Sequence, residues 1–233
     1  MRRFVEIFGK SHEQLDVLLN CAGIRVLDRR TTQDGLELMF GSEYLGHFLL
    51  TNLLVPALIA GAPSRVVTIS GEGHKAGVEG GEGATMNFDD LQYEKSWNPV
   101  RASKQLVLAK ILFTYELARR LEGTGVAVHT VSPPFTRTNL PSHYPWFVRA
   151  IAKLRMWQSK AKSPEEGARC LSQVATDPEL EGMTGKYFVE GKLAESSPKS
   201  YDLDAARRLW EISERLVGQS FAFGYGQTGH SPG

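Results

Sequence analysis

The sequence has little of what marks secreted, metal-bound or membrane-spanning proteins. Its two cysteines, Cys21 and Cys170, are too few for a disulfide scaffold and lack the clustered spacing of a zinc site. It contains no run of 18 or more apolar residues, and the segment that follows Met1 lacks the apolar core of a secretion signal. These absences indicate a reducing compartment, and we expect a cytoplasmic protein.

An excess of charge of one sign is also missing. The 27 basic and 26 acidic side chains give a formal net charge of +1, so nothing in the composition attracts a phosphate backbone and no nucleic-acid partner is expected. Hydrophobic residues make up 42% of the chain and charged residues 23%, as in folded globular proteins. A chain of 233 residues can bury one sizeable core. We predict one domain over residues 1–218 and a flexible glycine-rich tail over 219–233.

What the sequence does contain is an alternation of strand-like and helix-like segments. Short apolar runs that end at glycine or proline predict buried strands, and spacing of three to four residues between apolar positions predicts helices. The expected strands are 15–19, 65–70, 126–131 and 185–189, and the expected helices are 4–8, 36–59, 100–121, one that begins near Ser163, and 205–217. This alternation is typical of right-handed βαβ units. It predicts an α/β fold with a parallel sheet flanked by helices.

Six short motifs add a more specific signal. They are Asn20-Cys21-Ala22-Gly23, Leu45–Thr51 (LGHFLLT), Ala102-Ser103-Lys104, Leu117–Leu121 (LARRL), Val131-Ser132-Pro133 with Thr138, and Gly185–Phe188 (GKYF). In this order, and over nearly the whole chain, they resemble motifs of the short-chain dehydrogenase/reductase family in its retinol-dehydrogenase-like branch. The resemblance implies a Rossmann-like fold, NAD- or NADP-linked chemistry, and an apolar small-molecule alcohol or carbonyl compound as substrate.

The resemblance also assigns catalytic positions, and most of them hold other residues here. The family uses a tyrosine with a lysine one helical turn later, a serine at a strand end, and a relay asparagine. Lys104 matches the lysine, but Val100 stands at the tyrosine position. Gly71 stands at the serine position beside Ser70, which would face the other side of the strand, and Glu43 replaces the asparagine. The predicted catalytic residues are Lys104 and Ser70.

The cofactor side is predicted from the same resemblance. The expected cofactor-binding residues are Asn20, Ala22, Gly23, Lys104, Pro133 and Thr138. The turn residues also have a structural interpretation, in which Gly23 supplies backbone freedom. A dinucleotide site needs a glycine-rich turn between the first strand and helix, and no segment before Leu15 supplies one. We therefore expect a fold without the first βαβαβ half, and poor cofactor binding. The glycine pattern at 224–229 lacks a following helix and is not expected to bind.

Three surface features carry competing interpretations. His74 could donate a proton, although we expect a solvated loop histidine. The basic amphipathic segment 147–157 is interpreted as a lid over the substrate, with contact to a membrane surface as the alternative. The strand at 15–19 is expected at a sheet edge, which predicts self-association.

Three functions remain open at this point. The chain is a truncated or degenerate family member with impaired oxidoreductase activity, a non-catalytic interaction protein that reuses the fold, or an active enzyme whose N-terminal half is missing from the sequence. The sequence favours the first.

Overall fold

The structure is a computed structural model that describes residues 1–75, 82–137, 144, 146–147, 150 and 161–223. A five-stranded sheet forms its centre, in the order β1-β2-β3-β4-β5. The strands are β1 (Val17–Asn20), β2 (Ser64–Ile69), β3 (Val126–Ser132), β4 (Lys186–Val189) and β5 (Lys192–Ala194). The first four are parallel and β5 is antiparallel to β4. The predicted α/β class is confirmed. The short β5 was not predicted, because three residues carry no clear periodicity.

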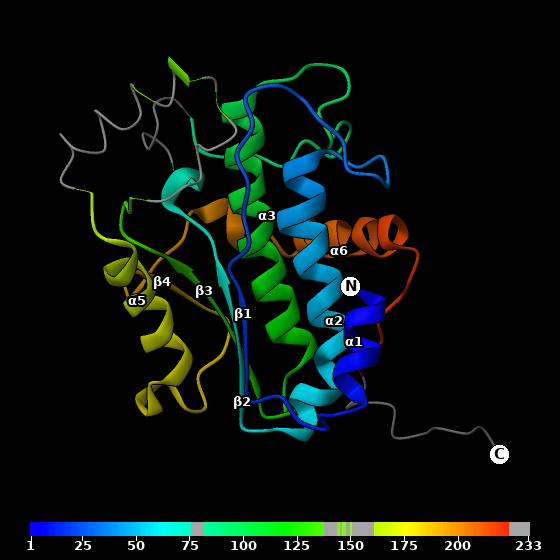
Figure 1. The fold of residues 1–233 in the computed structure, drawn as a ribbon, viewed down its shortest axis with the longest axis vertical. Coiled ribbons are helices and arrows are strands. Elements are labelled where there is room, and N and C mark those ends of the chain that lie inside the picture. Colours follow the sequence, from blue (N-terminus) through cyan, green and yellow to red (C-terminus); the bar gives the residue numbers. More distant parts are fainter. Residues whose placement is uncertain (76–81, 138–143, 145, 148–149, 151–160, 224–233) are drawn as a thin grey trace.

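Helices cover both faces of the sheet (Figure 1). The α-helices are α1 (Arg2–Gly9), α2 (Gly46–Ala60), α3 (Pro99–Arg120), α5 (Pro164–Thr176) and α6 (Leu203–Val217). Strand β2 shows how the faces differ. Val66 packs into a cluster with residues of α2, α3 and α6, whereas its neighbour Val67 packs against α5. Alternate residues of β2 are therefore buried on opposite faces, as expected for an inner strand of a parallel sheet.

The helix ends follow local capping chemistry. Asn98 accepts a hydrogen bond from the backbone N–H of Arg101, 3.0 Å away, with Pro99 in the first turn of α3. Ser163 and Glu166 cap each other reciprocally at the start of α5. Both starts are close to those predicted.

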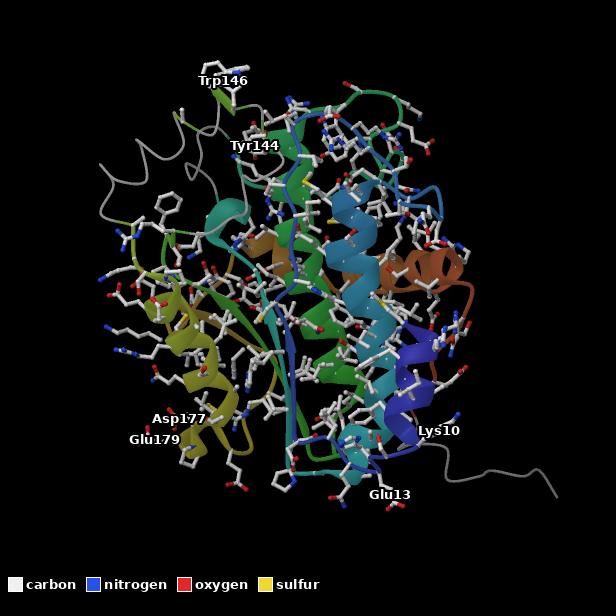
Figure 2. The ribbon with its side chains drawn as sticks, viewed as in Figure 1. Lys10, Glu13, Tyr144, Trp146, Asp177 and Glu179 are labelled. Carbon is white, nitrogen blue, oxygen red and sulfur yellow. The ribbon has the colours of Figure 1, made fainter. Side chains whose placement is uncertain are left out.

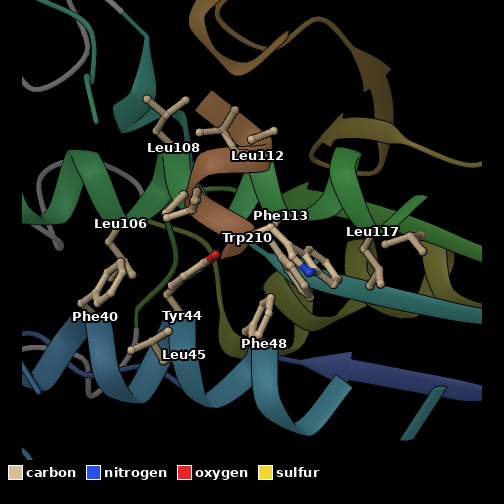
Figure 3. Close-up of a cluster of buried hydrophobic side chains, with 14 of the residues drawn as sticks. Phe40, Tyr44, Leu45, Phe48, Leu106, Leu108, Leu112, Phe113, Leu117 and Trp210 are labelled. Carbon is tan, nitrogen blue, oxygen red and sulfur yellow. The ribbon is translucent and has the colours of Figure 1, made fainter. Parts of the chain in front are cut away.

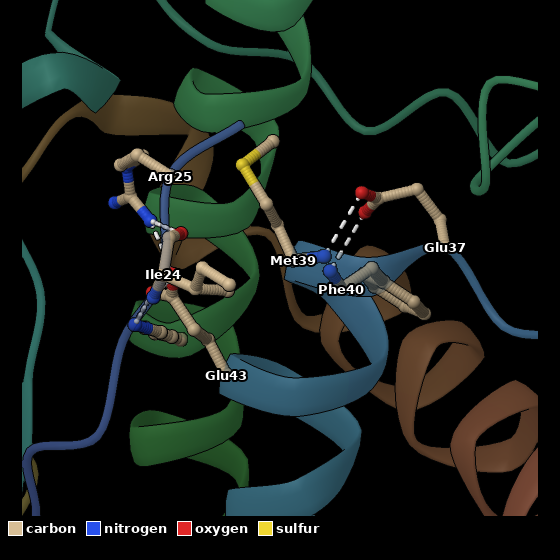
Figure 4. A network of polar contacts seen from close by, with 7 residues as sticks. Ile24, Arg25, Glu37, Met39, Phe40 and Glu43 are labelled. Carbon is tan, nitrogen blue, oxygen red and sulfur yellow. Dashed lines mark hydrogen bonds and ion pairs between the residues drawn. The ribbon is translucent and has the colours of Figure 1, made fainter. Parts of the chain in front are cut away.

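The helix predicted from residue 36 begins later than expected. The two carboxylate oxygens of Glu37 accept hydrogen bonds from the backbone N–H groups of Met39 and Phe40, at 2.9 and 2.7 Å (Figure 4). A π-helical segment, η1 (Phe40–Leu45), then leads directly into α2. Glu37 thus lies before the helix and accepts hydrogen bonds from the first free N–H groups of the helix. The helix therefore begins after this residue.

The terminal helix α6 docks through an aromatic cluster (Figure 3). Trp210 is buried, with ring centroids of Phe48 and Phe113 at 4.9 and 6.0 Å. Beside it, the Tyr44 hydroxyl is hydrogen-bonded to Ser213 at 2.8 Å. Trp210 thus holds the last helix to the core.

The chain beyond α6 continues along the same core. Phe221 is buried, and its ring lies 5.8 Å from that of Phe48. The glycine pattern at 224–229 lies outside the described residues. The division into a domain of residues 1–218 and a flexible tail stays a prediction.

Within the described residues, one helical segment, Phe40–Ala60, is long and apolar enough to cross a membrane. Its α2 part lies beside α3 on one face of the sheet (Figure 1), and eight residues of α2 are buried. Packing in the core of this domain accounts for its high hydropathy.

Strand β1 lies at the edge of the described sheet, as predicted. It was also expected to be buried on both faces, and this is wrong. The side chain of Leu19 is 42% exposed, because the cluster that α5 forms on β2 and β3 takes in Val17 of β1 but not Leu19. An apolar side chain beside unpaired strand backbone favours pairing with another chain.

We expect this edge to drive self-association, and Leu19→Lys to reduce it, because a charged side chain on an edge strand opposes strand pairing. Light scattering over a concentration series would show a lower average mass for this variant. Leu203→Lys is the matched control, since Leu203 is also about half exposed but lies on α6. A concentration-independent monomer for the unaltered chain would contradict the expectation.

Candidate active site at the carboxyl ends of the strands

The predicted site residues lie where the parallel strands end. Asn20 ends β1, Ser70 and Gly71 follow β2, and Pro133 follows β3. These ends share one side of the molecule, where Figure 2 labels Tyr144 and Trp146, whereas Glu13, Asp177 and Glu179 are labelled on the opposite side. Open α/β sheets bind ligands at the carboxyl ends of their strands. The topology therefore brings the predicted residues to the expected edge.

Glu43 is the most constrained of these residues. Its side chain is 2% exposed, and one carboxylate oxygen lies 2.7 Å from Nζ of Lys110 on α3. The other oxygen accepts hydrogen bonds from the Ile24 N–H, at 2.8 Å, and from the Arg25 guanidinium (Figure 4). Burial raises the pKa of Glu43, but Lys110, Arg25 and the Ile24 N–H together hold it below its usual value. Burial lowers the pKa of Lys110, against the attraction of Glu43.

Sequence reasoning missed Lys110 and Arg25 as partners of Glu43. Lys110 lies in the apolar run from Leu106 to Phe113, and its side chain is buried. A charged residue at a core position of a helix is rarely buried unless it is paired. The place of Lys110 within this apolar run was therefore the one sequence signal of a buried ion pair.

The turn after β1 packs directly onto Glu43. A Cβ atom at Gly23 would lie 3.3 Å from the Glu43 carboxyl carbon, and Gly23 does not have a positive φ. Close approach, rather than the backbone freedom of the structural interpretation, explains this glycine. The cofactor-binding assignment of Gly23 stays a prediction. The amide of Asn20 donates hydrogen bonds to Thr51 at 2.8 Å and Thr68 at 3.2 Å. Its buried side chain therefore anchors the turn, whereas Ala22 is exposed.

The end of β2 carries a serine and a glycine. Ser70 Oγ is buried and, within the part of the chain that the structure describes, has no hydrogen-bond partner. A Cβ atom at Gly71 would meet the Val107 side chain on α3 at 3.8 Å. The helical turn of α3 nearest to the serine position is thus the one at Val107.

Lys104 lies one turn before Val107 on the same helix. Its side chain is buried, and Nζ donates to the Glu82 carbonyl oxygen at 3.3 Å. Val100, at the predicted tyrosine position, is 51% exposed in the first turn of α3. Seven residues separate it from Val107, roughly 10 Å along the helix axis. The catalytic assignments of Lys104 and Ser70 stay predictions.

His74 is buried, and the expectation of a solvated loop histidine is wrong. Its side chain lies in a short 3-10 helix, η2 (Glu72–His74), that packs on α3. Nδ1 lies 2.8 Å from the Gly71 carbonyl oxygen, and the ring meets Tyr187 edge-on at 5.2 Å. Tyr187 donates to the same carbonyl at 3.4 Å. Burial lowers the pKa of His74 and raises that of Tyr187 to about 12, so both side chains are neutral near pH 7.

The described residues do not fit a complete dinucleotide site. Thr138 and most of segment 147–157 lie outside them, so the lid and membrane interpretations stay predictions. Pro133 is half-buried directly after β3. None of the described strands is followed by a glycine-rich turn that opens into an α-helix: β2 leads to η2, and β3 to Pro133-Pro134. Such a turn supplies the backbone N–H groups that bind pyrophosphate. The same residues contain no group of three or more side chains suited to hold a metal ion.

Known proteins resemble the chain over most of its length. It is 44% identical over 220 residues to human retinol dehydrogenase 14, covering 94% of this chain and 63% of that protein. It is 38% identical over 235 residues to mouse retinol dehydrogenase 13, covering 99% of this chain and 68% of that protein. Human polyprenol dehydrogenase is 39% identical over 224 residues, with 94% and 66% covered.

Solved structures share the fold. An uncharacterized protein from Mycobacterium Paratuberculosis superposes with a TM-score of 0.69 at 29% identity, covering 95% of this chain and 73% of that one. A short chain dehydrogenase from Burkholderia cenocepacia J2315 in complex with NADP superposes with a TM-score of 0.54 at 19% identity, covering 82% and 70%. No protein-family model matches the chain.

Proposed function

Because the chain belongs to the short-chain dehydrogenase/reductase family, in its retinol-dehydrogenase-like branch, we propose that it is an oxidoreductase homologue whose own residues are impaired in hydride transfer. The reaction of the branch is NAD(P)-linked oxidation or reduction of an apolar alcohol or carbonyl compound. One observation carries the proposed impairment. Glu43 stands at the relay asparagine position, and Lys110, Arg25 and the Ile24 N–H bind both of its carboxylate oxygens. A carboxylate held in this way is not available to a proton relay.

The general acid is missing in both alignments of α3 with the family's tyrosine and lysine. The resemblance pairs Val100 with Lys104, four residues apart. If the turn of α3 that faces Gly71 held the catalytic positions instead, Val107 would stand at the lysine position and Ser103 at the tyrosine position. Neither alignment contains a tyrosine, so neither supplies a phenol that a neighbouring lysine could activate.

A non-catalytic interaction protein is the second candidate function. The exposed edge at β1, with the Leu19 side chain on it, favours this reading. An active enzyme with further residues outside this sequence is the third, and the chain spans less than two thirds of its human relative. Cytoplasmic location stays a prediction in all three cases.

Binding and turnover of nicotinamide cofactors test the proposal. We expect calorimetric titration with NADH or NADPH to give a dissociation constant no tighter than millimolar, because the described residues lack a pyrophosphate-binding turn. We also expect no oxidation of NADPH above background with an apolar aldehyde. Micromolar binding, or turnover that Lys104→Ala abolishes and Lys75→Ala does not, would contradict the proposal.

A further inference from the structure

We infer that Lys110 is a positioning residue that holds the turn from Asn20 to Gly23 in place through Glu43. The inference rests on the proposed function only in naming this turn as the cofactor-facing one. Lys110 lies on α3, Glu43 on η1, and the turn follows β1. The buried pair therefore connects three elements that are far apart in the sequence.

The contacts form a continuous path. Lys110 Nζ lies 2.7 Å from one carboxylate oxygen of Glu43, and both side chains are at least 96% buried. The other oxygen accepts from the Ile24 N–H at 2.8 Å and from Arg25. A Cβ atom at Gly23 would lie 3.3 Å from the same carboxylate, which would have to shift by a few tenths of an ångström. Glu43 thus contacts three consecutive residues, from the last residue of the turn, Gly23, to Arg25.

Electrostatics make Glu43 depend on Lys110. A carboxylate removed from water must be paired and hydrogen-bonded, and Lys110 is its most deeply buried cationic partner, since Arg25 is partly exposed. His47 and Cys21 also face the pair, and His47 has no hydrogen-bond partner for either ring nitrogen among the described residues. Loss of the Lys110 charge leaves the Glu43 carboxylate without its buried counterion. The carboxylate then takes up a proton or moves toward water, and its hydrogen bond to Ile24 weakens in either case.

Amide hydrogen exchange of the Ile24 N–H measures directly the protection that its hydrogen bond to Glu43 provides. We expect Lys110→Met to accelerate deuterium uptake in residues 20–27 by about tenfold or more, with peptides from α5 changed much less. Lys110→Arg keeps the charge, and we expect it to preserve most of the protection. Uptake in residues 20–27 that stays unchanged, or that rises equally in all segments of Lys110→Met, would overturn the inference.

A second variant keeps the test decisive if Lys110→Met does not fold. Glu43→Gln combined with Lys110→Met removes both charges, and paired removal is better tolerated than a single buried charge. We expect this double variant to fold and to exchange residues 20–27 about threefold or more faster than the unaltered chain, because Lys110 no longer anchors the side chain at position 43 and only the partly exposed Arg25 remains beside it. Wild-type protection in the double variant would contradict the inference. Neither measurement uses cofactor or turnover, so failure of the proposed function would leave these outcomes unaffected.

Discussion

Acidification from pH 7 to pH 4 is expected to lower the free energy of unfolding by several kcal/mol, because two histidines are buried as neutral rings. His47 and His129 are at most 5% exposed, and within the described residues neither ring nitrogen of His47 has a hydrogen-bond partner. Burial lowers the pKa of each from 6.5 to about 4, assisted by Lys110 near His47 and by Arg65 near His129. At about 1.4 kcal/mol per pKa unit, each ring accounts for about 3 kcal/mol.

The sign follows from proton binding. Below pH 6.5 the unfolded chain binds protons at these histidines and the folded chain does not, so stability falls as the pH falls toward 4. Glu43, whose folded pKa is also lowered, adds a further loss below about pH 4.5. Urea unfolding at a series of pH values, followed by circular dichroism, measures the slope.

One substitution separates the buried rings from the rest of the chain. His129→Gln carries no titratable group and is expected to flatten the dependence between pH 6.5 and 4. His12→Gln, at an exposed position, is the matched control and should leave the slope unchanged. A pH-independent free energy of unfolding over this range would show that the two rings are not held neutral.

Truncation of Trp210 is expected to cost about 3 to 5 kcal/mol of stability. The side chain is buried against Phe48 and Phe113 (Figure 3). The Arg120 guanidinium lies over its ring at 4.1 Å from the centroid. Trp210→Ala therefore leaves a cavity between α2, α3 and α6. Guanidinium unfolding followed by circular dichroism would record the loss as a lower midpoint.

Trp210→Phe tests the cause of that loss. Phenylalanine keeps most of the apolar contact and removes the indole N–H, which has no partner in the described structure. We expect a cost well under half that of the alanine variant, since an unsatisfied buried donor disappears with the indole. Equal losses of stability for the two variants would show that the cavity is not the main cause of the destabilisation.

The arrangement of strands and helices could be predicted because each element carries its own periodicity. The apolar runs of β2 and β3 end at glycine or proline, and Asn98 and Ser163 announce the helices that follow. The errors occurred where tertiary contacts override local pattern. Glu37 caps the helix that it was expected to join, and His74 is buried by η2 folding onto α3.

The candidate site was less predictable because its contacts are long-range. Glu43 and Lys110 are 67 residues apart in the sequence, and no local pattern specifies which charged side chains will meet in the core. The family resemblance placed Glu43 at a catalytic position but gave no information on its new partners. The strand ends were predictable from topology, whereas the chemistry between them was not.

The hairpin of β4 and β5 determines how far assembly through this sheet can proceed. At this end the outermost strand is three residues long and begins with Lys192, and short, charged strands are poor templates for addition. Within the described sheet, only the opposite end, at β1, offers backbone to a second copy. Polymers need two complementary ends per subunit, whereas one self-complementary end closes after a single pairing about a two-fold axis. We therefore expect association through β1 to stop at the dimer and not to continue into fibrils.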